Sequence, residues 1–189
     1  MSKPRTCAII SGKESAMTET LQNLIQQMTK EIYRTYNLPE INAATNLQNT
    51  IQMLGGKLTY AYGIQTETIQ KTNDTTFCIT LSARKSDAYN TFAVGQKLGD
   101  LFLYMKYQID ETAWNNIPCN QPFETDTSEH AELTNYFAGY FLMPVERFEV
   151  QLKEHTNNNK CNIGQVAKHF GVTPCAAHWW SWKLGYSHL

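Results

Sequence analysis

The stretch NTFAVGQKLGDLFLYMKYQ, residues 90–108, carries the pattern on which the fold prediction depends. Its apolar residues predict a buried helix over about residues 86–106. Gln96, Lys97 and Asp100 interrupt this apolar run with polar side chains. Because residues three and four apart share one face of a helix, Asp100 lies on the same face as the other two. A buried helix with polar groups grouped in this way is a candidate site.

Composition and charge limit the classes of protein that the chain can belong to. Its 189 residues suffice for one sizeable domain, or for a domain with a small appendage, and 42% hydrophobic residues supply a packed core. A formal net charge of -1 argues against a general nucleic-acid binder. The sequence has no apolar run of about 18 residues and no long apolar region near its start, so we expect neither a transmembrane helix nor a signal peptide.

The cysteines predict the redox compartment. Their number is odd and no CxxC motif is present, which argues against a disulfide framework and favours a cytoplasmic chain with free thiols. We expect each thiol to be an inert, buried packing residue. The five residues are Cys7, Cys78, Cys119, Cys161 and Cys175.

The remaining secondary structure follows from hydrophobic periodicity and from helix stop signals. Leu38-Pro39 ends the first helix, Gly55-Gly56 ends the second, and Met143-Pro144 separates two later helices. The expected helices cover about residues 15–36, 43–54, 86–106 and 129–142, followed by one after residue 144 and two short ones near the end. Strands are expected at residues 58–64 and 76–82, and the polar stretch between them, which contains Asn73-Asp74, is expected to be a turn or irregular connection. The loop containing Pro118 and Pro122 and the run 155–160 are expected to be irregular surface segments.

Three further motifs define a family resemblance. Leu38-Pro39 and Leu54-Gly55 stand in the first part of the chain, and NYFAGYFLMP occupies residues 135–144. In this order the elements resemble the ImmA/IrrE family of bacterial metallopeptidase-like proteins, over roughly residues 20–187. That family has a helix of the form F-T-x-A-H-E-L-G-H followed by a helix that ends in N-x-F-A-x-x-L-L-M-P.

The resemblance implies an α+β fold. We expect a mainly helical, zincin-like minimal metallopeptidase core over residues 1–154 with a small sheet of about three strands. A helix-turn-helix-like appendage over residues 161–189 is expected to pack on this core. The central helix at about 86–106 is expected to pack against the helix at about 129–142.

The chain departs from the family at every position that would carry the chemistry. Two histidines of H-E-x-x-H share a helix face and bind one Zn²⁺, while the glutamate acts as general base. Gln96 and Asp100 stand at the histidine positions, and Lys97 stands at the glutamate position. Ala131 stands where the family has its third ligand, a glutamate. The resemblance therefore implies a vestigial site, with no catalytic residue, no bound metal and no cofactor expected.

Lys97 changes the charge of this predicted site. A glutamine amide is a poor zinc ligand, and a protonated lysine cannot accept a proton and repels a dication. We expect Lys97 to pair with Asp100 three residues away, or with a carboxylate on the facing helix such as Glu132.

A rearranged metal site is the alternative. If any metal binds, its ligands would come from Asp100, His130 and Glu132, with Glu129 nearby. Neighbouring residues of a helix point about 100° apart, so these side chains cannot all face Asp100. A solvated acidic helix start, which suits the helix dipole, is the simpler interpretation of this segment.

The C-terminal segment has the A-x-x-F-G-V-T-x-x-A pattern of a helix-turn-helix, with Thr173 as N-cap and Pro174 at the first helical position. Its second helix presents mainly alanine, histidine and tryptophan, and Lys183 is its only lysine or arginine. We expect Trp179, Trp180 and Trp182 to form a packing face, or a protein-binding surface where they are exposed. Reading of DNA is less favoured, because that function needs polar or basic groups on this helix.

The predicted function follows from the resemblance and its departures. No G-x-S-x-G, phosphate loop or G-x-G-x-x-G motif offers another catalytic arrangement. Active family members cut or antagonise repressors of mobile elements or stress regulons. We expect a non-catalytic, protein-binding regulator, encoded by a phage or other mobile element, whose partner is a helix-turn-helix repressor or another regulatory protein. The alternatives are a divergent zinc metallopeptidase that cleaves a repressor, for which Zn would be the cofactor, and a DNA-binding regulator.

Overall fold

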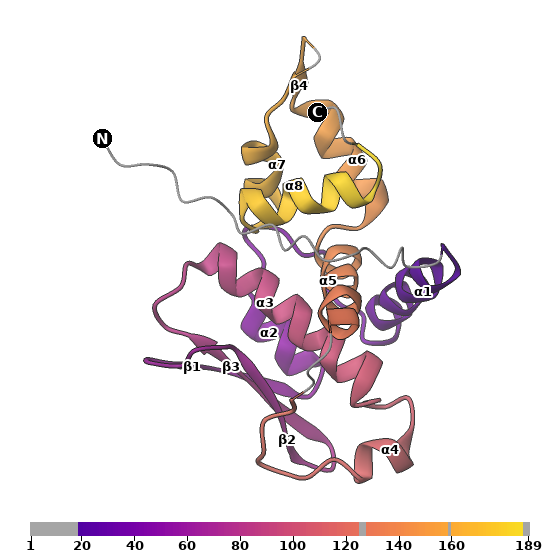
Figure 1. Ribbon diagram of the computed structural model, residues 1–189, viewed down its shortest axis with the longest axis vertical. Coiled ribbons are helices and arrows are strands. Elements are labelled where there is room, and N and C mark those ends of the chain that lie inside the picture. The colour runs from indigo at the N-terminus through magenta and orange to yellow at the C-terminus, as the bar shows by residue number, and fades with distance from the viewer. Residues whose placement is uncertain (1–18, 125–127, 159, 187–189) are drawn as a thin grey trace.

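The computed structural model describes residues 19–124, 128–158 and 160–186, which form a mainly helical α+β fold (Figure 1). The helices are α1 (Glu19–Thr35), α2 (Leu47–Met53), α3 (Asp87–Gly99), the π-helix η1 (Asp100–Tyr104), α4 (Glu111–Asn115), α5 (Ser128–Leu142), α6 (Val145–Glu154), α7 (Ile163–Phe170) and α8 (Pro174–Lys183). The strands are β1 (Gly56–Ala61), β2 (Thr68–Asn73), β3 (Thr76–Ser82), β4 (Thr156–Asn157) and β5 (Lys160–Cys161).

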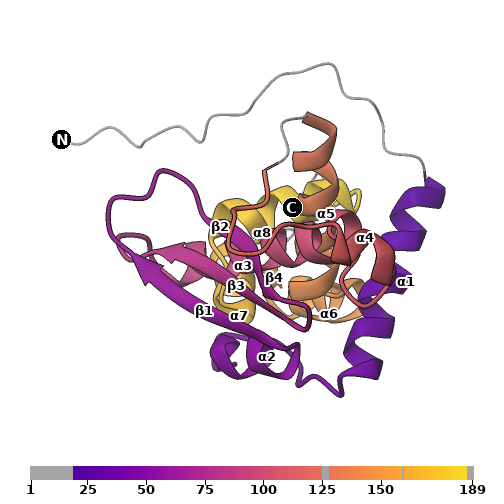
Figure 2. The same ribbon diagram turned by 90° about the horizontal axis from the view of Figure 1, so that it is seen from below.

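A three-stranded sheet closes one end of the molecule, with α2 and α3 on one of its faces (Figures 1 and 2). The strand order is β1-β3-β2, in which β1 runs parallel and β2 antiparallel to the central strand β3. Phe77, Ile79 and Leu81 alternate along β3 and are buried. This period of two directs one face of β3 into the core.

The helices α3 and α5 form the centre of the core, where their backbones approach closely. A Cβ atom added at Gly95 would lie 2.9 Å from the Ala138 Cβ, and one at Gly99 would lie 3.0 Å from the Thr134 Cα. The distance at Gly95 is shorter than Cβ contacts allow, and the distance at Gly99 is tight enough that Thr134 would have to shift, so this packing favours glycine at both positions of α3. The predicted pairing of the central helix with the helix of residues 129–142 is confirmed.

The C-terminal helices α6, α7 and α8 lie beyond α5, at the end of the molecule opposite the sheet (Figure 1). Trp180 is fully buried against Gly139, and its Nε1 donates to the Met143 carbonyl at 2.9 Å. The Ala43 amide donates to the His169 carbonyl at 2.8 Å, which joins α7 to the segment before α2. The C-terminal helices α7 and α8 are therefore packed on the rest of the chain.

Several predicted boundaries are confirmed. The break at Met143-Pro144 separates α5 from α6. The Thr173 hydroxyl caps α8 by accepting the Ala176 amide at 3.2 Å, and Gly171 takes the left-handed conformation that ends α7. The predicted helix at residues 15–36 corresponds to α1, and its first four residues lie outside the described part of the chain.

Other predictions are wrong. Residues 68–73, expected to be irregular, form β2, where Ile69 and Lys71 point inward between polar neighbours that hide the strand pattern. The loop before Pro118 contains α4, and the linker at 155–160 contributes to the β4–β5 hairpin. The helix expected at 86–106 is α-helical only to Gly99 and continues as η1.

The thiols also differ in part from the expectation. Cys78 and Cys161 are half-buried, whereas Cys119 and Cys175 are exposed, so the expected burial is wrong for Cys119 and Cys175. Cys119 forms an isolated bridge with Lys71, and Cys175 lies in the first turn of α8. Cys7 lies outside the described residues. Among the helices of the described ranges, none is both long and apolar enough to cross a membrane.

Candidate functional site

The polar positions of the opening stretch lie at the junction of α3 and η1. Gln96 and Lys97 belong to the last turn of α3, and Asp100 begins the π-helix. The Asp100 side chain is only 2% exposed, although it carries a carboxylate. Burial of a charge is costly unless the charge is paired and hydrogen-bonded, so the partners of Asp100 decide what this site can do.

Both carboxylate oxygens of Asp100 are occupied by other side chains. Lys97 Nζ lies 2.8 Å from Asp100 Oδ2, and His130 Nε2 lies 2.6 Å from Asp100 Oδ1. The predicted pair between Lys97 and Asp100 is confirmed. A carboxylate oxygen accepts hydrogen bonds, so the contact at Oδ1 is a hydrogen bond for the His130 tautomer that carries its proton on Nε2. The Lys97 contact joins α3 to the start of η1, and the His130 contact joins η1 to the first turn of α5.

The other positions of the predicted site have different surroundings. Gln96 Nε2 donates to Asn135 Oδ1 on α5 at 2.7 Å, so its amide links the two central helices. Ala131 is exposed, and its side chain has no atom that could bind a metal. Glu132 accepts from Lys183 Nζ of α8 at 3.4 Å. Of the candidate ligands, the structure brings Asp100 and His130 together and pairs Glu132 with a third element.

This donor set does not fit a zinc ion. Zinc sites in proteins use three or four nitrogen, sulfur or carboxylate ligands. Within the described ranges, no three His, Cys, Asp or Glu side chains are grouped so that they could hold a metal. A metal at Asp100 would also have to displace Lys97 from the carboxylate. No step through a metal is derived from this arrangement.

Tyr104 completes the surroundings of the Asp100 carboxylate. Its ring centroid lies 4.5 Å from that of His130. Burial raises the pKa of Tyr104, and the negative charges of Glu129 and Asp100 raise this pKa further. The phenol therefore stays protonated at neutral pH. Tyr104 is a site residue that we did not predict, and its spacing of four from Asp100 is the sequence signal that could have indicated it.

The three tryptophans of α8 have different environments. Trp180 is buried and Trp179 is half-buried, with its ring centroid 5.6 Å from that of Tyr136. Trp182 is 46% exposed, and Lys183 Nζ lies 4.7 Å from its ring centroid. Trp180 therefore packs the core, whereas Trp182 contributes apolar surface to solvent.

The exposed positions of α8 carry no Lys or Arg side chain within the described part of the helix. They are Pro174, Cys175, His178 and Trp182. This face lacks the cations that bind phosphates and the bidentate donors that read base edges.

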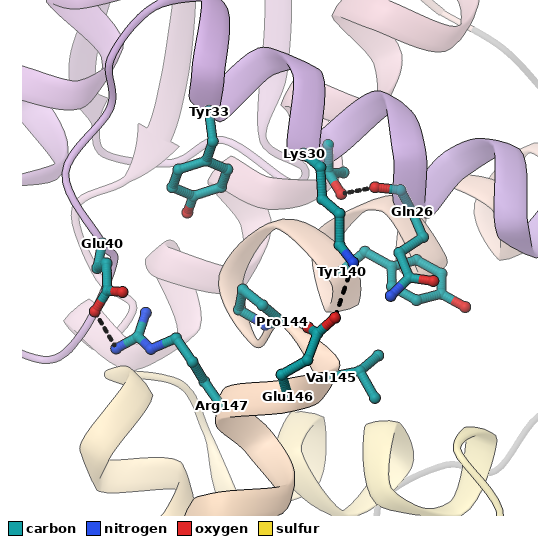
Figure 3. Close-up of a pocket in the computed structure, with 10 residues that line it drawn as sticks. Gln26, Lys30, Tyr33, Glu40, Tyr140, Pro144, Val145, Glu146 and Arg147 are labelled. Atoms are coloured by element: carbon teal, nitrogen blue, oxygen red, sulfur yellow. Dashed lines mark hydrogen bonds and ion pairs between the residues drawn. The ribbon is translucent and has the colours of Figure 1, made fainter.

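A separate pocket of about 270 Å³ lies between α1 and the start of α6 (Figure 3). The Tyr33 hydroxyl, which donates to the Phe141 carbonyl at 2.8 Å, belongs to its wall, and burial raises the pKa of this tyrosine. Lys30 and Glu146 pair across the pocket at 2.8 Å, with both side chains more than half exposed. The pocket shares no lining residue with the surroundings of Asp100.

No protein-family model matches the chain, and no curated protein is significantly similar to it. The resemblance to the ImmA/IrrE family therefore stays a prediction that rests on the motifs quoted above.

Proposed function

We propose that this protein is a non-catalytic, protein-binding regulator built on a metallopeptidase-like core. Its partner is a repressor or another regulatory protein, and its gene belongs to a phage or other mobile element. In this proposal the chain keeps a binding surface of its relatives and has lost their cutting chemistry.

The pairing of Lys97 and His130 with one buried carboxylate carries the proposal. A peptidase needs a metal-bound water and a base, and H-E-x-x-H would supply both at this place. Here the ammonium of Lys97 is the cation beside Asp100, and His130 binds the second oxygen. The polar residues satisfy one another, so the proposed site is a structural ion pair that needs no exogenous ion.

The surface of α8 supports protein binding over DNA binding. Trp182 is exposed, and Lys183 is held by Glu132 and lies near the ring of its neighbour. Exposed aromatic residues are enriched at protein interfaces, whereas DNA readers present cations to phosphates.

A divergent metallopeptidase is the second candidate. The observation in its favour is the contact between Asp100 and His130, two residue types that bind zinc. This candidate requires Lys97 to leave the carboxylate and a third ligand to approach.

A chelator experiment separates the two candidates. The protein is co-expressed with candidate repressors and a reporter gene, and the pair that shows relief is reconstituted with and without EDTA. The proposal predicts equal relief in both conditions and an intact repressor on denaturing gels. Loss of relief with EDTA, or an accumulating repressor fragment, contradicts it and favours the metallopeptidase.

A further inference from the structure

The two edges of the sheet differ in what covers them. Along β2, the Asn120 amide donates to the Lys71 carbonyl and the Phe123 amide donates to the Ile69 carbonyl, both at 2.7 Å. The segment of residues 120–123 therefore covers the edge formed by β2. Along β1, no backbone hydrogen bond to the outer edge is formed by any residue in the described ranges. In backbone hydrogen bonding the sheet thus has one closed edge and one open edge, and α2 lies beside the start of the open edge (Figure 2).

The backbone of β1 shows which groups are available at the open edge. The Ala61 carbonyl accepts the Ala83 amide at 2.9 Å, so Ala61 turns its backbone groups towards β3. In a parallel pair, alternate residues point their N–H and C=O to opposite sides of the strand. Leu58 and Tyr60 therefore point theirs outward, where an added strand would find donors and acceptors at the usual spacing.

The side chains at the end of β1 add aromatic surface to this edge. Tyr60 is 58% exposed and Tyr62 is 77% exposed, while Leu58 on the same strand is buried. Large aromatic side chains left in solvent on an edge strand offer contact area to a neighbouring strand.

The charge around this edge is positive. Lys57 is exposed on β1, and Arg84 and Lys85 are exposed directly after Ala83, whose amide donates to the Ala61 carbonyl. The nearby carboxylates are those of Asp87 and Glu67, of which Glu67 accepts from the Tyr89 hydroxyl at 3.4 Å. A second copy of β1 would bring a second set of these cations to the edge, which is unfavourable. Negative side chains on an added strand would instead be attracted.

From the open edge, its tyrosines and its cations, we infer that β1 binds an extended, acidic segment of the protein partner by strand addition. This inference rests on the proposed protein-binding function and identifies the surface and the chemistry of the partner. Main-chain hydrogen bonds would supply affinity and the cations would select acidic side chains.

The probes are two capped peptides, one of alternating valine and glutamate and one of alternating valine and lysine. Each is titrated into the full-length, ¹⁵N-labelled protein, and amide shifts are followed by NMR. We expect the acidic peptide to shift the amides of Leu58 and Tyr60 and the lysine peptide to leave them unchanged. Tyr60→Pro removes an outward N–H together with the phenol ring and fixes φ, and should weaken binding of the acidic peptide by about tenfold.

Two variants complete the design. Tyr60→Ala keeps the N–H and serves as the matched control, with binding expected within about threefold of the wild type. Lys57→Glu should weaken binding of the acidic peptide without unfolding the protein, because its side chain is exposed. The melting temperature of each variant shows whether it is folded.

Four results would overturn the inference: no shift with the acidic peptide, equal shifts with both peptides, full binding by folded Tyr60→Pro, or concentration-dependent shifts of β1 without peptide. The last result would identify a second copy as the occupant. The inference can also fail while the proposed function stands. In that case the peptide does not bind, but Lys57→Glu still relieves the repressor with and without EDTA, and the partner-binding surface lies elsewhere on the protein.

Discussion

Lys97 Nζ lies 2.8 Å from Asp100 Oδ2, and the Asp100 carboxylate is almost completely removed from solvent. The ammonium is thus the nearest compensating charge for a buried anion, with His130 Nε2 as the second contact. Since the two residues are three apart, the transition from α3 to η1 brings both to one place.

Replacement of the lysine measures this compensation. Lys97→Met keeps most of the side-chain stem and leaves Asp100 with the His130 contact, so we expect a loss of about 2–3 kcal/mol in unfolding free energy. The expected loss is below the full range for a buried pair because Lys97 is 21% exposed. Urea denaturation measures the change.

Lys30→Met is the matched control for this variant. Lys30 pairs with Glu146 at the same distance of 2.8 Å, but the two side chains are 56% and 65% exposed. Exposed pairs contribute about 0–1 kcal/mol, so the control should be nearly neutral. Equal stability of the two variants would show that Asp100 does not depend on Lys97.

The tryptophans of α8 predict how the C-terminal segment contributes to stability. Trp180→Ala removes a fully buried ring and its hydrogen bond to Met143, and should cost about 3–5 kcal/mol. Trp182→Ala, at a 46% exposed position of the same helix, should cost less than about 1 kcal/mol. Chemical denaturation compares them. A Trp180→Ala protein with wild-type stability would show that α8 folds independently of α5.

His169 predicts a dependence of stability on pH. Burial, followed by the positive charge of Arg147, lowers the pKa of His169. A folded-state pKa below the unfolded value contributes stability above about pH 6.5, and this contribution is lost as the pH falls through the folded pKa. The unfolding free energy of the wild type should therefore fall more steeply between about pH 7 and pH 5 than that of His169→Gln. Parallel pH profiles for the two proteins would contradict this assignment.

The sequence allowed the helical core to be predicted because its helices carry strong periodicity and clear stop signals, such as Met143-Pro144 and Thr173-Pro174. It did not indicate β2, because Lys71 occupies an inward position of that strand. Lys71 is buried there through contacts distant in sequence: its Nζ donates to the Trp114 carbonyl at 3.2 Å. Such a contact depends on tertiary packing and leaves no local pattern.

The candidate site, like the fold, could be predicted only in part from the sequence. The spacing of Lys97 and Asp100 was enough to predict their pairing, because it depends on helix geometry alone. The roles of His130 and Tyr104 were not predictable in this way. Which residue of the α5 start faces Asp100 depends on the rotation of α5 against α3, and this rotation is set by close contacts at Gly95 and Gly99.

A four-residue variant provides the control for a test of metal binding. Gln96→His, Lys97→Glu and Asp100→His restore the H-E-x-x-H pattern, and Ala131→Glu adds the third predicted ligand. We expect the triple variant to bind zinc weakly and the quadruple variant to bind it more tightly, since three protein ligands are usual in catalytic zinc sites. Circular dichroism shows whether each variant keeps the helical fold.

Zinc titration of the wild-type protein by calorimetry tests the central claim most directly, with the quadruple variant measured beside it. If Lys97 is the cation of this site, the wild type takes up no stoichiometric zinc, while the quadruple variant takes up about one ion per chain. Tight binding of about one zinc ion by the wild type, lost in Asp100→Asn and His130→Ala, would contradict the account and establish a metal site at Asp100.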